Sequence, residues 1–213
     1  MTPGRRWIAS SDVLSIFPTL IWKFELAPEA RPGVNAKLLG ALEKLRPAPG
    51  ARVPARGWQS HHALHTLDEL AELMAYINEA VSAVLKFLKI GYDDFEITGC
   101  WANLNPPGAS HPIHSHPNNF LSGVYYVRTQ PEADTINFHD PRVQTAIIRP
   151  PVTELMTANT DQVVVKVTAG SLLVFPAYLL HSVDPNGSQE ERISISFNVM
   201  FSAFTEHLSK PLW

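Results

Sequence analysis

Cysteine is almost absent from this chain, which has a single one, Cys100, among 213 residues. One cysteine excludes an internal disulfide framework, so the chain fits a reducing compartment. Long apolar runs are missing too, because no stretch approaches the roughly 18 residues that a membrane span needs. Residues 1–11 also lack the apolar core of a signal peptide. We therefore expect a cytoplasmic protein without a membrane partner.

Strong charge of either sign is also lacking, since the formal net charge is only -3. No basic stripe and no charged tail is visible, which argues against a nucleic-acid partner. No internal repeat is visible either, which argues against a solenoid or a propeller.

The chain has enough apolar residues for one sizeable core, at 45% hydrophobic, and we expect a single domain over residues 1–213. The sequence pattern changes near Phe95. Residues 13–94 favour a supporting layer of helices, and residues 95–203 favour short strands separated by turn signals such as Pro106-Pro107-Gly108. Helices followed by closely spaced strands predict an α+β, mainly β fold: an antiparallel sandwich or barrel with helical support.

Individual elements follow from periodicity. Residues 13–26 look extended, and one helix is expected after Pro32, ending near Leu45. A longer helix is expected from Leu67 to Leu88, with Thr66 and Glu69 as a capping box and Gly91 as the C-cap. Strands are expected over 96–103, 120–127, 135–138, 143–148, 162–167, 171–175 and 192–201.

Three histidines occur within six positions, at His111, His114 and His116, just before the strand expected over 120–127. Residues at i and i+2 of an extended segment point to one face, so His114 and His116 can reach one metal ion. His181, near the end of another strand-like run, is a candidate third ligand. Two histidines and one carboxylate are typical of non-haem iron sites, but imidazole also suits zinc, copper and nickel. A histidine-rich polar loop is the simpler alternative.

Arg192 opens the last strand-like run, in which Ile193 and Ile195 alternate with Arg192 and Ser194. One face of this strand is therefore apolar, and the other carries a guanidinium and a hydroxyl. If the second face lines a barrel, the pair can bind a carboxylate. The alternative is an exposed arginine paired with Glu190 or Glu191.

Other polar residues have ordinary explanations. His61, His62, His65 and His207 show no partner in the sequence and are interpreted as surface or hydrogen-bonded histidines. Arg142 is interpreted chiefly as a member of a structural ion pair.

The order and spacing of several motifs together resemble a known family. The motifs are Gly108, His114-x-His116, the strand FLSGVYYV, GSLLVFP followed by His181, and Arg192-Ile193-Ser194. They resemble the iron(II)- and 2-oxoglutarate-dependent oxygenases, and within them a bacterial and phage 2OG-Fe(II) oxygenase family with a prolyl-hydroxylase-like core. Gly57-Trp58-Gln59-Ser60, Trp101-Ala102-Asn103, residues 139–142 and Pro185-Asn186 also look like that smaller family. The resemblance covers residues 13 to 203.

The resemblance implies a double-stranded β-helix, or jelly roll, that binds Fe(II) and uses 2-oxoglutarate as cosubstrate. It implies that the metal ligands are His114, His116 and His181. Arg192 is then expected to bind the distal carboxylate of 2-oxoglutarate, with Ser194 beside it. Tyr126 is a weaker candidate for the same carboxylate, since ordinary core packing explains it equally well.

This chain departs from the superfamily pattern at one position, because His116 stands where an aspartate or a glutamate is usual. A three-histidine iron site is the favoured outcome. It leaves the centre with charge +2 instead of +1, which favours anionic ligands. The alternatives are that His116 does not coordinate, or that the protein binds another metal or has no oxygenase activity. By its register, His111 is expected to line the site without coordinating.

The resulting hypothesis is a dioxygenase that couples oxidative decarboxylation of 2-oxoglutarate to hydroxylation of a small-molecule or amino-acid-type substrate. One alternative is a cupin-like three-histidine dioxygenase that is independent of 2-oxoglutarate and has no need of the Arg192 and Ser194 pair. The other is a metal- or ligand-binding jelly roll without turnover. A homo-oligomer is compatible with the sequence.

Overall fold

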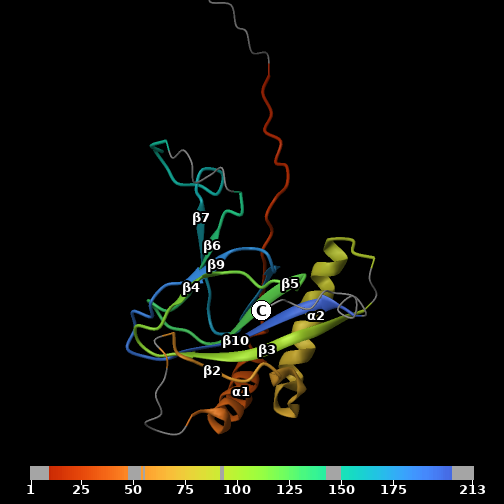
Figure 1. Ribbon diagram of the computed structural model, residues 1–213, viewed down its shortest axis with the longest axis vertical. Coiled ribbons are helices and arrows are strands. Elements are labelled where there is room, and N and C mark those ends of the chain that lie inside the picture. The colour runs from red at the N-terminus through yellow and green to blue at the C-terminus, as the bar shows by residue number, and fades with distance from the viewer. Residues whose placement is uncertain (1–9, 48–53, 55, 92–93, 143–149, 203–213) are drawn as a thin grey trace, which may run out of the picture.

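The computed structural model describes residues 10–47, 54, 56–91, 94–142 and 150–202 (Figure 1). Two α-helices are present in this part of the chain, α1 (Arg31–Leu45) and α2 (Ala71–Phe87), with two 3₁₀ turns before α2 (Leu64–Thr66 and Asp68–Leu70). The strands are β1 (Trp22–Glu25), β2 (Trp58–Gln59), β3 (Phe95–Asn105), β4 (His111–His114), β5 (Leu121–Arg128), β6 (Thr135–His139), β7 (Gln162–Lys166), β8 (Ser171–Pro176), β9 (His181–Val183) and β10 (Arg192–Phe201).

The strands form two antiparallel sheets. One has the order β1-β8-β5-β10-β3-β2, and the other has the order β4-β9-β6-β7. From β3 to β10 the chain crosses between the sheets, so that β3, β5, β8 and β10 belong to the larger sheet and the other four to the smaller. This is the winding of a double-stranded β-helix, and it confirms the predicted mainly β jelly roll.

The larger sheet separates two apolar cores. Its outer face packs against α1 and α2, as Figure 1 shows, with Ile193, Ile195 and Phe197 of β10 in that core. Its inner face meets the smaller sheet, and a second apolar core lies between them. This core contains residues of β5, β6 and β8, namely Val124, Tyr126, Ile136, Phe138, Leu173 and Phe175. Successive residues of a strand point to opposite faces, so β10 contributes its isoleucines to one core and its polar residues to the space between the sheets.

Helix α2 follows the predicted apolar stripe, with Met74, Ile77, Val81 and Val84 buried, but both predicted caps are wrong. The helix begins at Ala71, after two 3₁₀ turns, and has no side-chain cap. Thr66 Oγ1 donates instead to the carbonyl of Ala63 at 2.8 Å.

The C-terminal turn of α2 is closed at Lys89 and not at Gly91. Lys89 has a φ of 52°, and the amide of the next residue, Ile90, donates to the carbonyl of Leu85 at 3.0 Å. This is the Schellman pattern, which needs one left-handed residue and here obtains it from a lysine.

The remaining elements agree with the prediction in kind but differ in extent. Helix α1 begins at Arg31 and buries Leu38, Ala41 and Leu42. The expected extended segment 13–26 contains only the short strand β1, and Val13, Leu14 and Phe17 are exposed. The expected strand 143–148 lies outside the described residues. Strands β2, β4 and β9 were not predicted.

No helix in the described part of the chain is long and apolar enough to cross a lipid bilayer.

Candidate active site

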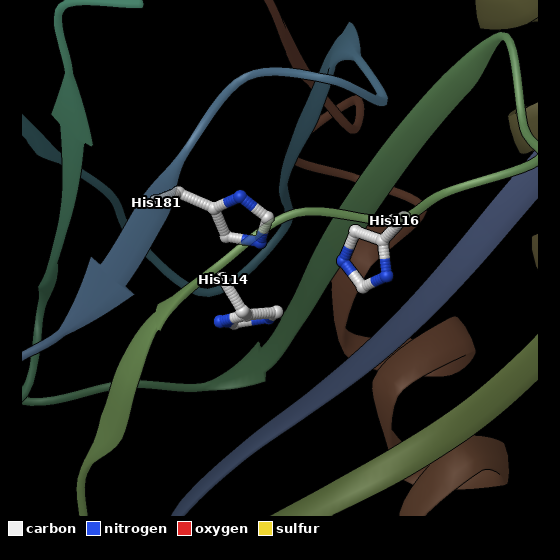
Figure 2. A group of neighbouring side chains, drawn as sticks. All are labelled: His114, His116 and His181. Carbon is white, nitrogen blue, oxygen red and sulfur yellow. The ribbon is translucent and has the colours of Figure 1, made fainter. Parts of the chain in front are cut away.

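Three of the predicted site histidines converge between the two sheets (Figure 2). His114 is the last residue of β4, His181 is the first residue of β9, and the two are direct cross-strand partners. His116 lies two residues beyond β4, held by its backbone amide, which donates to the carbonyl of Ala177 at 2.9 Å. One ring nitrogen of each histidine lies within 4.8 Å of the other two. The sequence therefore predicted the group, although His116 reaches it from outside the strand.

Backbone carbonyls fix the tautomers of two of these rings. His114 Nδ1 lies 2.8 Å from the carbonyl of Pro112, and His181 Nδ1 lies 2.9 Å from the carbonyl of Leu179. A carbonyl oxygen only accepts, so each Nδ1 carries the proton, and each Nε2 keeps its lone pair. A backbone carbonyl that accepts the Nδ1 proton in this way orients a metal-bound histidine and sets its tautomer.

Burial keeps two of these rings, those of His116 and His181, uncharged. Desolvation lowers the pKa of His181 to about 3, and that of His116 to about 4, with a smaller contribution from the neighbouring His114. At neutral pH both rings are therefore free of the extra proton that would compete with a metal ion. Three imidazole nitrogens within 4.8 Å of one another, two of them on rings with assigned tautomers, fit a divalent transition-metal ion, and iron(II), nickel and zinc all accept imidazole.

A cavity of about 60 Å³ opens beside the three histidines and extends to Arg192, whose side chain also lines it. Arg192 is only 3% exposed, and among the described residues no carboxylate forms an ion pair with it. Its Nη2 donates to Asn105 Oδ1 at 3.1 Å, whereas its buried Nε has no partner. Glu191 pairs with Arg46, so the alternative of an exposed Arg192 bound to its acidic neighbours is wrong.

A buried guanidinium without a carboxylate is costly unless something completes it. Burial lowers the pKa of Arg192, and the nearby Tyr126 opposes that effect, but an arginine retains its charge in proteins. Arg192 has an unpartnered Nε and lines the cavity that the three histidines also line, so the arrangement fits an anionic ligand with its carboxylate on Arg192.

Tyr126 and Ser194 lie where the sequence predicted, on the cavity side of β5 and β10, and they are direct cross-strand partners. Both are almost fully buried. Burial raises the pKa of Tyr126 to about 12, partly offset by the positive charge of Arg192. The phenol is therefore protonated at neutral pH and is available as a hydrogen-bond donor.

His111 lines the same cavity but does not belong to the group of three, as its register predicted. Its Nε2 lies 2.9 Å from Asn105 Nδ2. Burial, and next the charge of Arg192, lower the pKa of His111 to about 4. The imidazole is thus neutral beside a cation.

Sequence reasoning missed the polar residues of β2 and β3 that line the cavity. Gln59 Nε2 donates to Asn103 Oδ1 at 2.8 Å, and Asn103 Nδ2 donates to Ser196 Oγ at 3.0 Å. Trp101 lies next to them, with its ring centroid 5.8 Å from that of His116. The alternation of Trp101, Asn103 and Asn105 with buried Cys100, Ala102 and Leu104 was the signal that could have identified them.

The remaining histidines of the described residues, and Arg142, do not line the cavity. His61 and His62 are both exposed, and His62 stacks on Trp101 with ring centroids 4.7 Å apart. Arg142 forms the predicted ion pair with Asp140, at 2.6 Å. His207 lies outside the described residues.

Comparison with known proteins agrees with this geometry. A family model described as "Putative 2OG-Fe(II) oxygenase" matches residues 99–198, a range that contains the three histidines and Arg192. A search for sequence relatives among curated proteins found no significant match.

Several solved structures share the fold. A Pseudomonas putida prolyl-4-hydroxylase is 18% identical, with a TM-score of 0.59 over 87% of this chain and 94% of that one. HygX from Streptomyces hygroscopicus, with nickel, 2-oxoglutarate and hygromycin B bound, is 13% identical, with a TM-score of 0.60 over 88% and 85%. The non-heme alpha-ketoglutarate-dependent epimerase SnoN is 15% identical, with a TM-score of 0.61 over 92% and 89%.

Proposed function

We propose that this chain is an iron(II)- and 2-oxoglutarate-dependent oxygenase, and specifically a hydroxylase whose iron is held by His114, His116 and His181. The match of a 2OG-Fe(II) oxygenase family model to residues 99–198 supports this proposal. The observation that carries this proposal is the shared cavity. The three histidines, with one ring nitrogen each within 4.8 Å of the other two, line the same cavity as Arg192, a buried arginine whose Nε has no partner. When bound, iron(II) and 2-oxoglutarate supply the oxidising chemistry that introduces oxygen into a C–H bond, with succinate and carbon dioxide as by-products.

Arg192 is proposed to bind the distal carboxylate of 2-oxoglutarate. Its buried charge has only a neutral acceptor, Asn105, so a carboxylate gains a charge-assisted hydrogen bond without displacing an existing ion pair. Tyr126 and Ser194, across the strands from one another, are proposed as additional donors to the same group. This arrangement orients the cosubstrate with its 2-oxo acid end toward the three histidines.

The apolar walls are proposed to exclude water. Val124, Ile136, Phe175 and Val183 are among the apolar residues that line the cavity. A water-poor site strengthens the attraction between Arg192 and a carboxylate, and it protects reactive species from solvent.

The substrate is proposed to be a small molecule or an amino-acid-type compound that enters beside Trp101 and Gln59. The cavity is small, and Gln59 is exposed where it lines it. Gln59, Asn103 and Ser196 offer uncharged hydrogen-bonding groups. HygX, which was crystallised with hygromycin B, is a neighbour of this fold that binds a small molecule.

The assay that tests this function is oxygen-dependent formation of succinate from 2-oxoglutarate by the iron-loaded protein, alone and with a panel of amino acids and amino sugars. We expect loss of succinate by at least about tenfold in His181→Ala, which removes a ligand, and in Arg192→Ala, which removes a charged hydrogen-bond donor. Arg142→Ala, which alters an exposed ion pair outside the cavity, serves as the matched control.

Two outcomes would redirect the proposal. If the protein binds iron and 2-oxoglutarate but shows no turnover, it is a ligand-binding jelly roll and not an oxygenase. Bound iron without binding of 2-oxoglutarate would favour a three-histidine dioxygenase that uses no cosubstrate. Incorporation of labelled oxygen from O₂ into the product separates hydroxylation from the epimerase chemistry named for SnoN.

A further inference from the structure

Asn105 is the last residue of β3 and the direct cross-strand partner of Arg192 on β10. It is completely buried, at 0% exposure. A buried amide must find partners for its oxygen and for both of its N–H groups, or it destabilises the fold. The hydrogen-bond partners of Asn105 therefore indicate its role in the fold.

The partners of Asn105 leave only one orientation of its amide. Oδ1 accepts from Arg192 Nη2 at 3.1 Å, and Nδ2 donates to the carbonyl of Arg56 at 2.7 Å. Arginine only donates and a carbonyl only accepts, so the oxygen must face Arg192. Nδ2 also lies 2.9 Å from His111 Nε2, and this ring nitrogen accepts the second N–H of the amide.

The turn before β2 is shaped to reach this amide. Gly57 has a φ of 90°, and a Cβ at this position would clash with the carbonyl of Leu104 and lie 2.8 Å from Asn105 Nδ2. Only glycine combines that backbone conformation with that approach. The loop, His111 and β3 thus fix Asn105 from three directions.

We infer that Asn105, held by the Arg56 carbonyl and His111, is the positioning residue that orients Arg192 for the distal carboxylate of 2-oxoglutarate. Its neutral oxygen restrains one end of the guanidinium but leaves the positive charge uncompensated. A carboxylate at the same place would neutralise Arg192 and compete with the cosubstrate. This inference rests on the proposed function, because it assigns Arg192 to 2-oxoglutarate.

The test compares two ligands that differ only in the group that Arg192 is proposed to bind. 2-Oxoglutarate carries a distal carboxylate, whereas 2-oxobutyrate has the same 2-oxo acid end without it. Titration calorimetry on the nickel-loaded protein gives the Kd of each ligand for the wild type, Asn105→Asp and Asn105→Leu. Asn137→Asp, which alters a buried strand asparagine that does not line the cavity, is the matched control.

We expect both Asn105 variants to bind 2-oxoglutarate at least about tenfold more weakly, the loss typical of a charged hydrogen bond. Their Kd for 2-oxobutyrate and for nickel should stay within about twofold of the wild type. Asn105→Asp retains the size of the side chain, so it provides the result if the leucine variant does not fold.

Unchanged 2-oxoglutarate affinity in Asn105→Asp would overturn the inference and leave the proposed function intact. Equal weakening of both ligands would also overturn it, because it would indicate general damage and not a lost orientation of Arg192. If the wild type binds nickel but not 2-oxoglutarate, the proposed function itself fails.

Discussion

His116 stands where this superfamily usually has a carboxylate, and the charge of the site follows from that one residue. A carboxylate would neutralise one of the two positive charges of a divalent ion, whereas three neutral imidazoles neutralise none. The proposed cosubstrate is a dianion, and Arg192 adds a further positive charge in the same cavity. We therefore expect an unusually strong dependence of cosubstrate binding on its negative charge.

Replacement of His116 by alanine should weaken nickel or iron(II) binding by about a hundredfold, since even the outer partners of metal ligands contribute 10–100-fold. Competition with a chromogenic chelator measures the affinity. His111→Ala is the control, because His111 lines the cavity but lies outside the group of three. Equal affinity in His116→Ala and the wild type would show that His116 is not a ligand.

Two adjacent tyrosines of β5 provide a second test at this scale. Tyr126 faces the cavity, whereas Tyr125 faces the helices and donates to Asn35 Oδ1 at 2.6 Å. Because the Tyr126 phenol is protonated at neutral pH, Tyr126→Phe should raise the Kd of 2-oxoglutarate by about tenfold, the loss of one hydrogen bond to a charged group. Tyr125→Phe should leave that Kd unchanged. Titration calorimetry gives the Kd of 2-oxoglutarate for each variant. An equal change of Kd in Tyr126→Phe and Tyr125→Phe would exclude a direct role for Tyr126.

At the scale of elements, prediction succeeded where one strand or helix carries its own pattern. The period of two along β5 and β10 predicted which residues face the cavity, and the stripe of α2 predicted its buried face. Prediction failed where the structure of a segment depends on residues elsewhere in the chain that pair with it. Strand β9 has only three residues and owes its existence to β4 and β6, and Asn105 owes its role to the register of β3 against β10.

Helix α2 supports the larger sheet from behind, and its contribution can be measured. Ile77 is completely buried in the core between α2 and that sheet. Ile77→Ala should lower the free energy of unfolding by about 2–5 kcal/mol through lost burial and a residual cavity. The neighbouring Asn78 is exposed, so Asn78→Ala should change it by no more than about 0.5 kcal/mol. Urea denaturation measures both, and similar values for the two variants would contradict the assigned buried face.

At the scale of the whole molecule, the buried histidines link folding to pH. His111, His116 and His181 have a pKa of about 4, 4 and 3 in the fold, below the ordinary value of 6.5. Between those values the unfolded chain binds more protons than the folded one, so acid favours unfolding. This contribution to stability is complete above pH 6.5 and is lost as the pH falls toward 4.

The chelator-treated protein should therefore be clearly less stable at pH 5 than at pH 7.5. Each of the three histidines contributes a slope of at most about 1.4 kcal/mol per pH unit. Urea denaturation across this range gives the total slope, and His181→Gln should reduce it by removing one titrating group. A stability that does not change between pH 7.5 and pH 5 would mean that these rings are not held neutral by burial.

The pairing of His114 with His181 also constrains the order of events during synthesis and folding. These residues are neighbours across β4 and β9, yet β5, β6, β7 and β8 separate them in the chain. A nascent chain that ends before β9 has only two of the three donors, and it also lacks Arg192. If the three histidines bind the metal as proposed, metal binding requires the completed winding of the jelly roll, and a chain truncated before β9 does not form the metal site.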